Sequence, residues 1–355
     1  MSSQIKNVLI TGSKGYIGPV LIHHIKNHMP NIHITGIDTG YFNETFSDIE
    51  QFNQHSPDHY LELDFRTLTE ADLIDYDAII HLAAISNDPM GESYKAVTED
   101  INLKQSIKFA ENAKNANVKK FVFASSCSVY GLVEGEDTVS EQSSIAPVTT
   151  YAKTKVDFES ALKTLSTPSF QCICLRFATA CGPSSNLRLD LVLNDFVHSA
   201  LFKGEINILS DGKPWRPLID TRDMASALAW AAFNFSFDTP FIALNTGQNK
   251  NNFQIKDLAN IVAKQLDGVK VNLDEKNQPD KRSYKVDFSQ FEALVEDQIP
   301  LHSLEDTVST LTKLMIQLKQ DGRLGTFEQR KRLFTLNQLK LSGSLNEQLY
   351  WNSQI

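Results

Sequence analysis

Two side chains four residues apart have the chemistry of a proton-transfer pair. Tyr151 and Lys155 open a segment with a helical pattern, so both project from one helix face. A phenol with a pKa of about 10 is a poor base at neutral pH, but a nearby ammonium and a helix N-terminus favour the tyrosinate. The pair is therefore a candidate for moving a hydroxyl proton, although the same spacing also occurs in surface pairs.

A hydroxyl upstream of this pair is a candidate partner. The apolar run Phe121–Ser125 predicts a strand, and Ser126 follows it in the sequence SSCSVYG. Ligands of open parallel sheets bind outside the carboxyl ends of the strands. A serine hydroxyl of this stretch is therefore expected to hydrogen-bond the substrate oxygen that Tyr151 protonates or deprotonates.

A glycine-rich turn predicts a dinucleotide site near the N-terminus. Gly12, Gly15 and Gly18, in ITGSKGYIG, follow a strand-like run and open a helix-like segment. These glycines allow a tight turn, a close backbone approach to a pyrophosphate and close packing of the helix on the sheet. The helix N-terminus adds free N–H groups for the phosphates. The other residues of this turn that we expect at the cofactor are Tyr16 and Ile17.

The choice of cofactor depends on an acidic residue at the end of the next strand-like run. Asp38 stands 20 residues after Gly18. A carboxylate there accepts hydrogen bonds from the adenosine ribose and repels the additional phosphate of NADP, so NAD is the predicted cofactor. Asp64, beside Phe65, is a second candidate, either for the adenine amino group or as a plain turn residue.

Short apolar runs alternate with helix-like segments through the first half of the chain. The predicted strands are Asn7–Thr11, Ile32–Asp38, Ala78–Ala83, Phe121–Ser125 and Cys172–Phe177, and the predicted helices are Gly18–Lys26, Ala96–Asn115 and Tyr151–Leu165. This alternation indicates βαβ units. We therefore expect an α/β fold, a Rossmann-type doubly wound parallel sheet with a smaller C-terminal substrate lobe.

The pattern becomes irregular after Gly182, which suggests three regions. Residues 1–182 are expected to form the NAD-binding domain, with later segments returning to it. Residues 183–323 would form mainly the substrate lobe. Residues 324–355 are polar and helix-favouring, and they would serve either as an oligomer contact or as a helix packed on its own subunit.

Composition limits the remaining classes of function. The 355 residues carry a net charge of −9, which argues against a nucleic-acid-binding surface. The sequence lacks the run of about 18 apolar residues that a membrane helix needs, and it lacks the pattern of a signal peptide. A cytoplasmic protein with no membrane partner is expected. Its four cysteines are expected to be reduced thiols, and no metal site is predicted.

The ordered motifs ITGSKGYIG, ID, HLAA, SSCSVYG, YAKTK and LRFATACGP resemble the extended short-chain dehydrogenase/reductases. The likeness is to the NAD-dependent nucleotide-sugar epimerase/dehydratase family, specifically its UDP-galactose 4-epimerase-like members, over roughly the first 300 residues. It implies that Ser126, Tyr151 and Lys155 are the catalytic set and that Lys155 also holds the nicotinamide ribose. It further implies that Asn102 helps to position the active-site helix. The HLAA residues implied at the cofactor are Leu82, Ala83 and Ala84.

The resemblance also implies a nucleotide-diphosphate sugar as substrate. Arg216 and Arg282 match phosphate-binding arginines, although Pro217 and Asp220 depart from the family pattern beside the first. The other residues expected at the substrate are Ser86, Asn87, Thr179, Arg188 and Asn194.

Several reactions stay open within this family. A 4-epimerase is the leading expectation, and the alternatives are a 4-keto-sugar reductase or 4-dehydrogenase, a 4,6-dehydratase and a non-catalytic NAD-binding regulator. Dehydratase relatives carry Asp-Glu where this chain has Cys127 and Ser128, which disfavours elimination of water. Family members typically pair through two helices, which here would be Ala96–Asn115 and Tyr151–Leu165, so a homodimer is expected.

Overall fold

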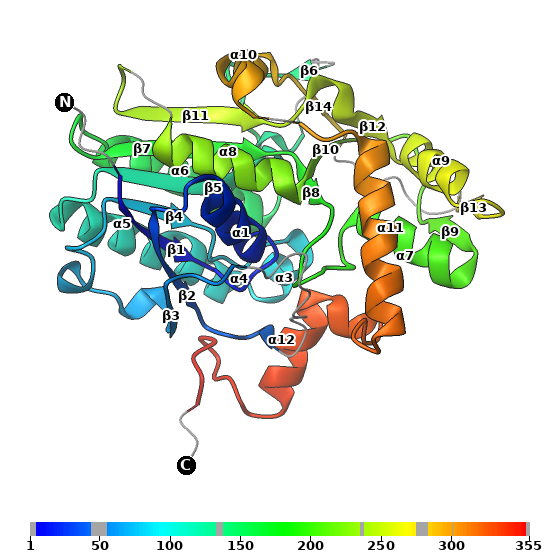
Figure 1. Ribbon diagram of the computed structural model, residues 1–355, viewed down its shortest axis with the longest axis horizontal. Helices are drawn as coiled ribbons and strands as arrows, with labels where there is room; N and C mark the ends of the chain where they lie inside the picture. The colour runs from blue at the N-terminus through cyan, green and yellow to red at the C-terminus, as the bar shows by residue number, and fades with distance from the viewer. Residues whose placement is uncertain are drawn as a thin grey trace.

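The centre of the computed structural model is a sheet of seven parallel strands in the order β11-β7-β5-β4-β1-β2-β3 (Figure 1). The structure describes residues 5–43, 55–132, 138–234, 238–274, 283–299 and 301–352. The strands are β1 (Asn7–Thr11), β2 (His33–Asp38), β3 (His59–Glu62), β4 (Ala78–His81), β5 (Lys120–Ser126), β7 (Gln171–Phe177) and β11 (Phe241–Thr246). The strand order reverses between β1 and β4, so the predicted doubly wound fold is confirmed.

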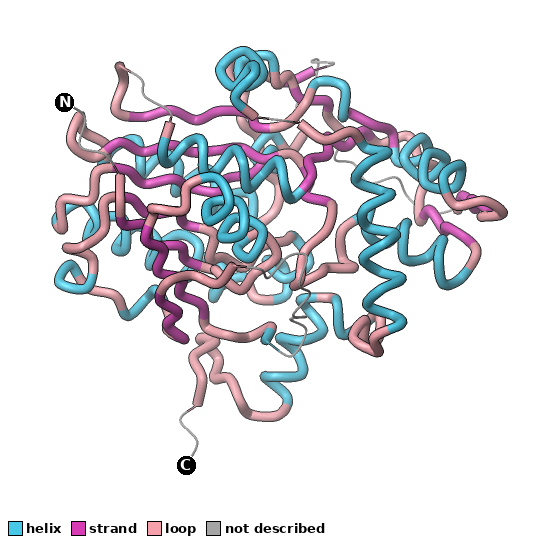
Figure 2. Tube along the Cα trace, in the orientation of Figure 1, coloured by secondary structure: helices cyan, strands magenta, loops and turns pink. Residues whose placement is uncertain are grey.

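Helices cover both faces of this sheet (Figure 2). The helices are α1 (Gly18–His28) and α8 (Thr221–Phe233) on one face, and α5 (Ser106–Asn115) and α6 (Thr150–Leu165) on the other. Successive strand residues point to opposite faces, so Val8 and Ile10 join the core beneath α1 and α8 while Leu9 joins the core beneath α5 and α6. Burial on both faces explains why these strands are continuous apolar runs.

A smaller lobe stands beside the carboxyl ends of the strands, with its own apolar core. Its elements are β8 (Thr179–Cys181), α7 (Val192–Lys203), β9 (Glu205–Ile208), β10 (Trp215–Asp220), β12 (Asn252–Gln254), α9 (Ile255–Gln265), β13 (Lys270–Leu273) and α11 (Leu304–Gln320). The chain leaves this lobe after β10 to form α8 and the edge strand β11, and then re-enters it at β12. The two parts are therefore interwoven in sequence.

The remaining elements connect or cover these layers. They are η2 (Phe65–Thr67), η3 (Glu70–Asp72), α3 (Asp88–Ser93), α4 (Lys95–Glu99), the π-helical turn η4 (Asp100–Gln105), η5 (Cys127–Tyr130), β6 (Thr138–Val139), η6 (Asn249–Asn251), β14 (Lys285–Val286), α10 (Ser289–Val295), η7 (Glu296–Gln298), η8 (Glu328–Arg330) and α12 (Arg332–Leu341). All four cysteines are buried and free. Within the described residues, no helix is both long and apolar enough to span a membrane.

Candidate active site

A cavity of about 840 Å³ lies at the carboxyl ends of the sheet strands. Its wall includes Gly12 after β1, Leu82 after β4 and Ser126 at the end of β5. The strand order reverses between β1 and β4, and this is the place where doubly wound sheets bind ligands. The wall continues into the smaller lobe through Asn207 and Arg216, so one cavity joins the expected cofactor and substrate regions.

The predicted catalytic set meets in this cavity. Thr149 caps α6 by accepting a hydrogen bond from the Ala152 backbone N–H at 3.1 Å, which places Tyr151 and Lys155 in the first turns of that helix. The Tyr151 phenol hydrogen-bonds Ser126. Tyr151, Lys155 and Ser126 all line the wall.

The surroundings of Tyr151 raise the pKa of its phenol and so disfavour its ionisation. Burial raises the pKa of its phenol well above 10, and the Asp88 carboxylate raises it further. The hydrogen bond from Ser126 and the positive charge of Arg188 act in the opposite direction. A protonated phenol is therefore the resting form, and a further positive charge beside it would lower its pKa and favour the tyrosinate, the form that can accept a proton from a substrate hydroxyl.

The Lys155 side chain points from α6 toward strand β5. Its ammonium donates to the Ala124 carbonyl at 2.7 Å and stands 5.4 Å from the centre of the Tyr151 ring. Burial lowers the pKa of Lys155 to about 7, while the Glu159 carboxylate one turn further along α6 raises it. The charge on Lys155 at neutral pH therefore depends on its buried surroundings, which is common at catalytic sites.

The glycine-rich turn fits a dinucleotide. Gly12 has φ +70°, and a Cβ there would stand 2.8 Å from the Ala83 backbone nitrogen, so a larger residue would collide with the wall. Helix α1 begins without a side-chain cap and has no acidic residue in its first turn. Its N–H groups and dipole are thus available to a phosphate. The Asp38 carboxylate accepts from the Lys14 and Gly40 backbone N–H groups at 3.0 and 2.9 Å, which fixes it beside this turn.

Most of the residues predicted from the sequence line the cavity. They are Gly12, Gly15, Tyr16, Ile17, Asp38, Asp64, Phe65, Leu82, Ala83, Ala84, Ser86, Asn87, Ser126, Tyr151, Lys155, Thr179, Arg188 and Arg216. Three described residues, Gly18, Asn102 and Asn194, stand behind the wall instead. Arg282 lies outside the described residues.

Those three residues support the wall from behind. A Cβ on Gly18 would stand 2.3 Å from the Ser13 carbonyl oxygen, so α1 packs tightly against the turn. Asn102, within the π-helical turn, accepts from the Ile85 N–H at 2.8 Å and donates to the Ile85 carbonyl at 2.9 Å. The fully buried Asn194 donates to the Tyr16 hydroxyl at 2.9 Å.

Two of the charged residues predicted from the sequence are held in ion pairs. Arg188 makes a two-point pair with Asp190, at 2.9 and 3.0 Å, and donates to the Ser86 hydroxyl at 3.1 Å. Asp64 similarly binds the Arg66 guanidinium, with a shortest contact of 2.6 Å. Each pair keeps a charge fixed at the wall.

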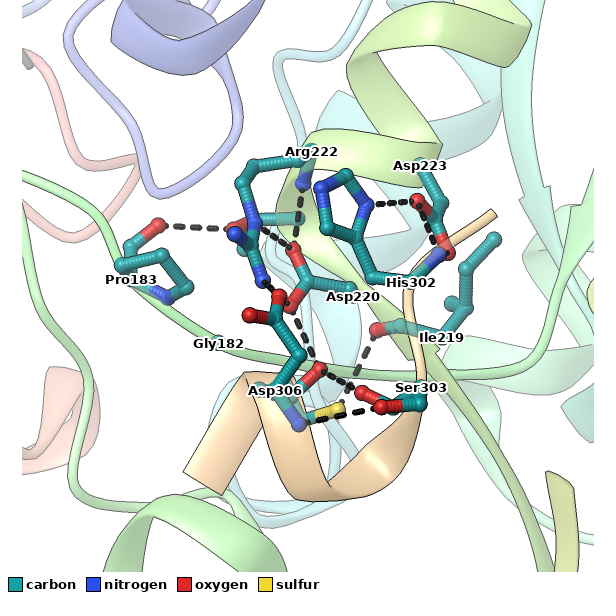
Figure 3. Close-up of polar contacts among 12 residues, drawn as sticks. Gly182, Pro183, Ile219, Asp220, Arg222, Asp223, His302, Ser303 and Asp306 are labelled. Atoms are coloured by element: carbon teal, nitrogen blue, oxygen red, sulfur yellow. Dashed lines mark hydrogen bonds and ion pairs between the residues drawn. The ribbon is translucent and has the colours of Figure 1, made fainter. Parts of the chain in front are cut away.

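Asp220, one of the departures from the family pattern, belongs to a polar network outside the cavity wall (Figure 3). It caps α8 and pairs with Arg222 at 2.8 Å, and it accepts from Thr307 on α11 at 2.6 Å. Asp223 pairs with His302 at 2.5 Å in the same network. The network joins α8 to the start of α11, so Asp220 has a structural role in connecting the sheet domain to the lobe.

Some residues of the wall carried too weak a sequence signal to be selected as site residues. Asp88 accepts from Thr149 at 2.6 Å and lies close enough to Tyr151 to affect its pKa. The Ser128 hydroxyl is buried at the wall without a hydrogen-bond partner among the described residues. The sequence signals for these two residues are that Asp88 follows Ser86 and Asn87, which are expected at the substrate, and that Ser128 belongs to the SSCSVYG motif. Arg332, from the C-terminal segment, carried no signal at all.

Comparison with known proteins agrees with this geometry. The model of the family described as NAD dependent epimerase/dehydratase matches residues 8–247. Among curated proteins, the chain is 27% identical over 217 residues to the uncharacterized UDP-glucose epimerase YtcB of Bacillus subtilis strain 168, covering 59% of this chain and 67% of that protein. It is 26% identical over 200 residues to the UDP-glucose 4-epimerase of Pisum sativum, covering 53% and 56% of the two chains.

Solved structures share the fold. The UDP-N-acetylglucosamine 4-epimerase of Methanobrevibacter ruminantium M1, in complex with UDP-N-acetylmuramic acid, superposes with a TM-score of 0.74 at 24% identity, over 89% of this chain and 99% of that one. The NAD-dependent NDP-hexosamine 5,6-dehydratase TunA has a TM-score of 0.73 at 20% identity, over 87% of this chain and 97% of that one. Epimerases and a dehydratase thus share this architecture, and NAD is the cofactor of the family.

Proposed function

Since this chain belongs to the NAD dependent epimerase/dehydratase family, we propose that it is a nucleotide-sugar 4-epimerase. The observation that carries the proposal is the meeting of Ser126, Tyr151 and Lys155 in a cavity that continues to Arg216. An Arg guanidinium suits the oxygens of a nucleotide diphosphate. The substrate in this proposal is therefore a nucleotide-diphosphate sugar with its hydroxyl-bearing carbon at Tyr151.

Each residue of the set has one task in the proposed reaction. Bound NAD supplies the hydride acceptor, and later the hydride donor, for the sugar carbon. Tyr151 takes the hydroxyl proton as the carbon loses its hydride, and Ser126 donates a hydrogen bond to the same oxygen. Lys155 stabilises the tyrosinate by its charge. With the keto sugar turned over in the cavity, Tyr151 would return the proton to the same oxygen, so the substrate would be isomerised without net oxidation.

The residues beside Ser126 disfavour elimination of water. The Cys127 thiol is buried and donates to the Arg176 carbonyl at 3.1 Å, and burial raises its pKa. Ser128, a residue of the cavity wall, carries a neutral hydroxyl that is itself buried. Neither is a carboxylate that could protonate a leaving hydroxyl or remove a C–H proton. A net reductase or dehydrogenase uses the same catalytic set, so it remains the second candidate.

Mass spectrometry of the products separates these reactions. Incubation with NAD and UDP-, GDP-, CDP- or dTDP-sugars is expected to give, from at least one of them, an isomer of unchanged mass that separates from the substrate by chromatography. Loss of two hydrogens, with NAD reduced to NADH, would indicate a dehydrogenase instead. A product lacking one water would contradict the epimerase proposal and direct attention to carboxylates such as Asp88.

We also propose that the protein is a homodimer that pairs through α5, α6 and the turns before α5. These helices pack side by side, and their exposed positions carry charges of both signs, including Lys104, Lys108, Lys153 and Asp157. Light scattering at micromolar concentration is expected to give about 80 kDa, twice the chain mass of 39.8 kDa. A mass of one chain at that concentration would reject the dimer.

A further inference from the structure

The C-terminal segment, residues 324–352, follows α11 and returns to the cofactor half of the cavity. In Figure 1 this red segment lies beside β2 and β3, away from the orange helix α11. The Trp351 indole donates to the Thr39 carbonyl at 2.6 Å, and the Arg66 guanidinium donates to the Gln348 and Leu349 carbonyls at 2.8 and 3.1 Å. Thr39 follows Asp38 at the cavity wall, so the segment is attached beside the part of the wall where the adenosine is expected.

The C-terminal segment is held against the sheet domain by a buried side chain, hydrogen bonds and a strained backbone position. Leu349 has φ +55°, a backbone conformation that costs free energy for a residue with a side chain. Its side chain is fully buried in the core beneath α5 and α6. Its carbonyl also accepts from the Tyr41 hydroxyl, and Tyr350 stacks on the Arg66 guanidinium at 3.6 Å. Such a strained residue persists only where the surrounding contacts hold it.

This docking brings a buried cation, Arg332, to the glycine-rich turn. Arg332 is the first residue of α12, is 4% exposed and lines the cavity. Its guanidinium donates to the Asn186 side-chain oxygen at 2.7 Å and to the Asn186 carbonyl at 3.2 Å. The Asn186 amide in turn donates to the Lys14 carbonyl at 2.6 Å, between Gly12 and Gly15.

The other positively charged residues of the cavity wall have partners or roles away from the glycine-rich turn. Among the described residues, the cavity is lined by five lysines and arginines, namely Lys155, Arg188, Arg216, Lys331 and Arg332. Lys155 belongs to the catalytic set, and Arg188 is paired with Asp190. Arg216 stands in the lobe near Tyr284, and Lys331 pairs with Glu328 at 3.1 Å. Arg332 is thus the cation placed beside the turn that approaches the phosphates.

We propose that Arg332 binds the diphosphate of the dinucleotide cofactor, and that the C-terminal segment holds it in place. A guanidinium offers two parallel N–H groups to phosphate oxygens. Burial lowers the pKa of Arg332 to about 9, and Arg188 lowers it further, while Asp190 and Asp38 act in the opposite direction. An arriving diphosphate therefore stabilises a positive charge that the surrounding protein disfavours.

Three variants and three ligands test this assignment by binding alone, without turnover. The variants are Arg332→Gln, Arg332→Lys and Lys340→Gln, and the ligands are NAD, ADP-ribose and adenosine. Lys340 lies on the same helix outside the cavity wall, paired with Glu347 at 2.7 Å, so Lys340→Gln removes an equal charge as a control. Titration calorimetry gives each affinity whether or not the protein is an epimerase.

Arg332→Gln is expected to weaken NAD and ADP-ribose by about 10- to 100-fold, the effect of losing a hydrogen bond between charged groups, and to leave adenosine unchanged. Arg332→Lys keeps the charge and is expected to lose less affinity for NAD and ADP-ribose than Arg332→Gln. It serves as the test should Arg332→Gln fail to fold. Lys340→Gln should bind all three ligands normally. Equal losses for adenosine and NAD would mean a purely structural role, and unchanged NAD affinity would also overturn the proposal.

Discussion

Replacement of Tyr151 with Phe is expected to lower kcat by about 10²- to 10⁴-fold, the range that a positioned proton-transfer group contributes. The ring would still fill its place against Gly91, whose Cα approaches so closely that a Cβ there would stand 3.1 Å from the Tyr151 Cβ. Only the hydroxyl that hydrogen-bonds Ser126 is lost. NAD affinity, measured by calorimetry on the same preparation, should therefore change little.

Tyr94→Phe is the matched control for that variant. The Tyr94 hydroxyl donates to Asn337 at 2.6 Å, outside the main cavity wall, so the same atom is removed where no proton transfer is proposed. Its kcat should equal that of the unmodified protein. If Tyr151→Phe kept more than about a tenth of the activity, another group would have to be the base.

The sheet was predictable because its strands are apolar on both faces and are separated by helical segments. The strand Asn7–Thr11 has the predicted bounds, and the other four predicted strands differ from those observed by one or two residues at one end or at both. The predicted helix Ala96–Asn115 is helical throughout, but its middle residues Asp100–Gln105, between α4 and α5, have π-helical geometry. A π-helical turn holds about one residue more than an α-helical turn. This changes the spacing of the apolar residues too little to be seen in the sequence, although Asn102, in the π-helical stretch, hydrogen-bonds Ile85.

The site was predictable where its residues are close in sequence or follow strands. Tyr151 and Lys155 share a helix face by spacing alone, and Asp38 is the last residue of a strand. Arg332 reaches the glycine-rich turn through Asn186, which is 146 residues away, and this contact has no local pattern. Asn194 was expected at the substrate, but its amide is used by Tyr16 and by the Arg188 carbonyl. Only the three-dimensional packing reveals such distant partners.

The largest stability effect is expected one turn beyond Lys155, at Glu159. This carboxylate forms a buried ion pair with Arg176, with a shortest contact of 2.7 Å and side chains only 5% and 7% exposed. It also accepts from the Ser125 hydroxyl at 2.5 Å. Removing one partner of a buried pair leaves the other charge uncompensated, which costs about 3 to 5 kcal/mol. Glu159→Gln should therefore lower the free energy of unfolding in urea by about that amount.

Two comparisons distinguish this cause from a general loss of packing. Glu347→Gln makes the same change in a pair whose carboxylate is 82% exposed, and it should leave stability almost unaltered. The double variant Glu159→Met with Arg176→Met removes both charges and should recover much of the loss. A double variant as unstable as Glu159→Gln would show that an unpaired charge is not the cause.

The same variant should also change the pH dependence of turnover. The Glu159 carboxylate raises the pKa of Lys155, which burial has lowered to about 7. Without that carboxylate the pKa falls further, so Lys155 loses its proton at a lower pH. The proposed reaction needs the ammonium beside Tyr151, and activity should then decline at a lower pH on the alkaline side of the kcat profile. An alkaline limb that does not move in Glu159→Gln would mean that the charge of Lys155 does not control the reaction.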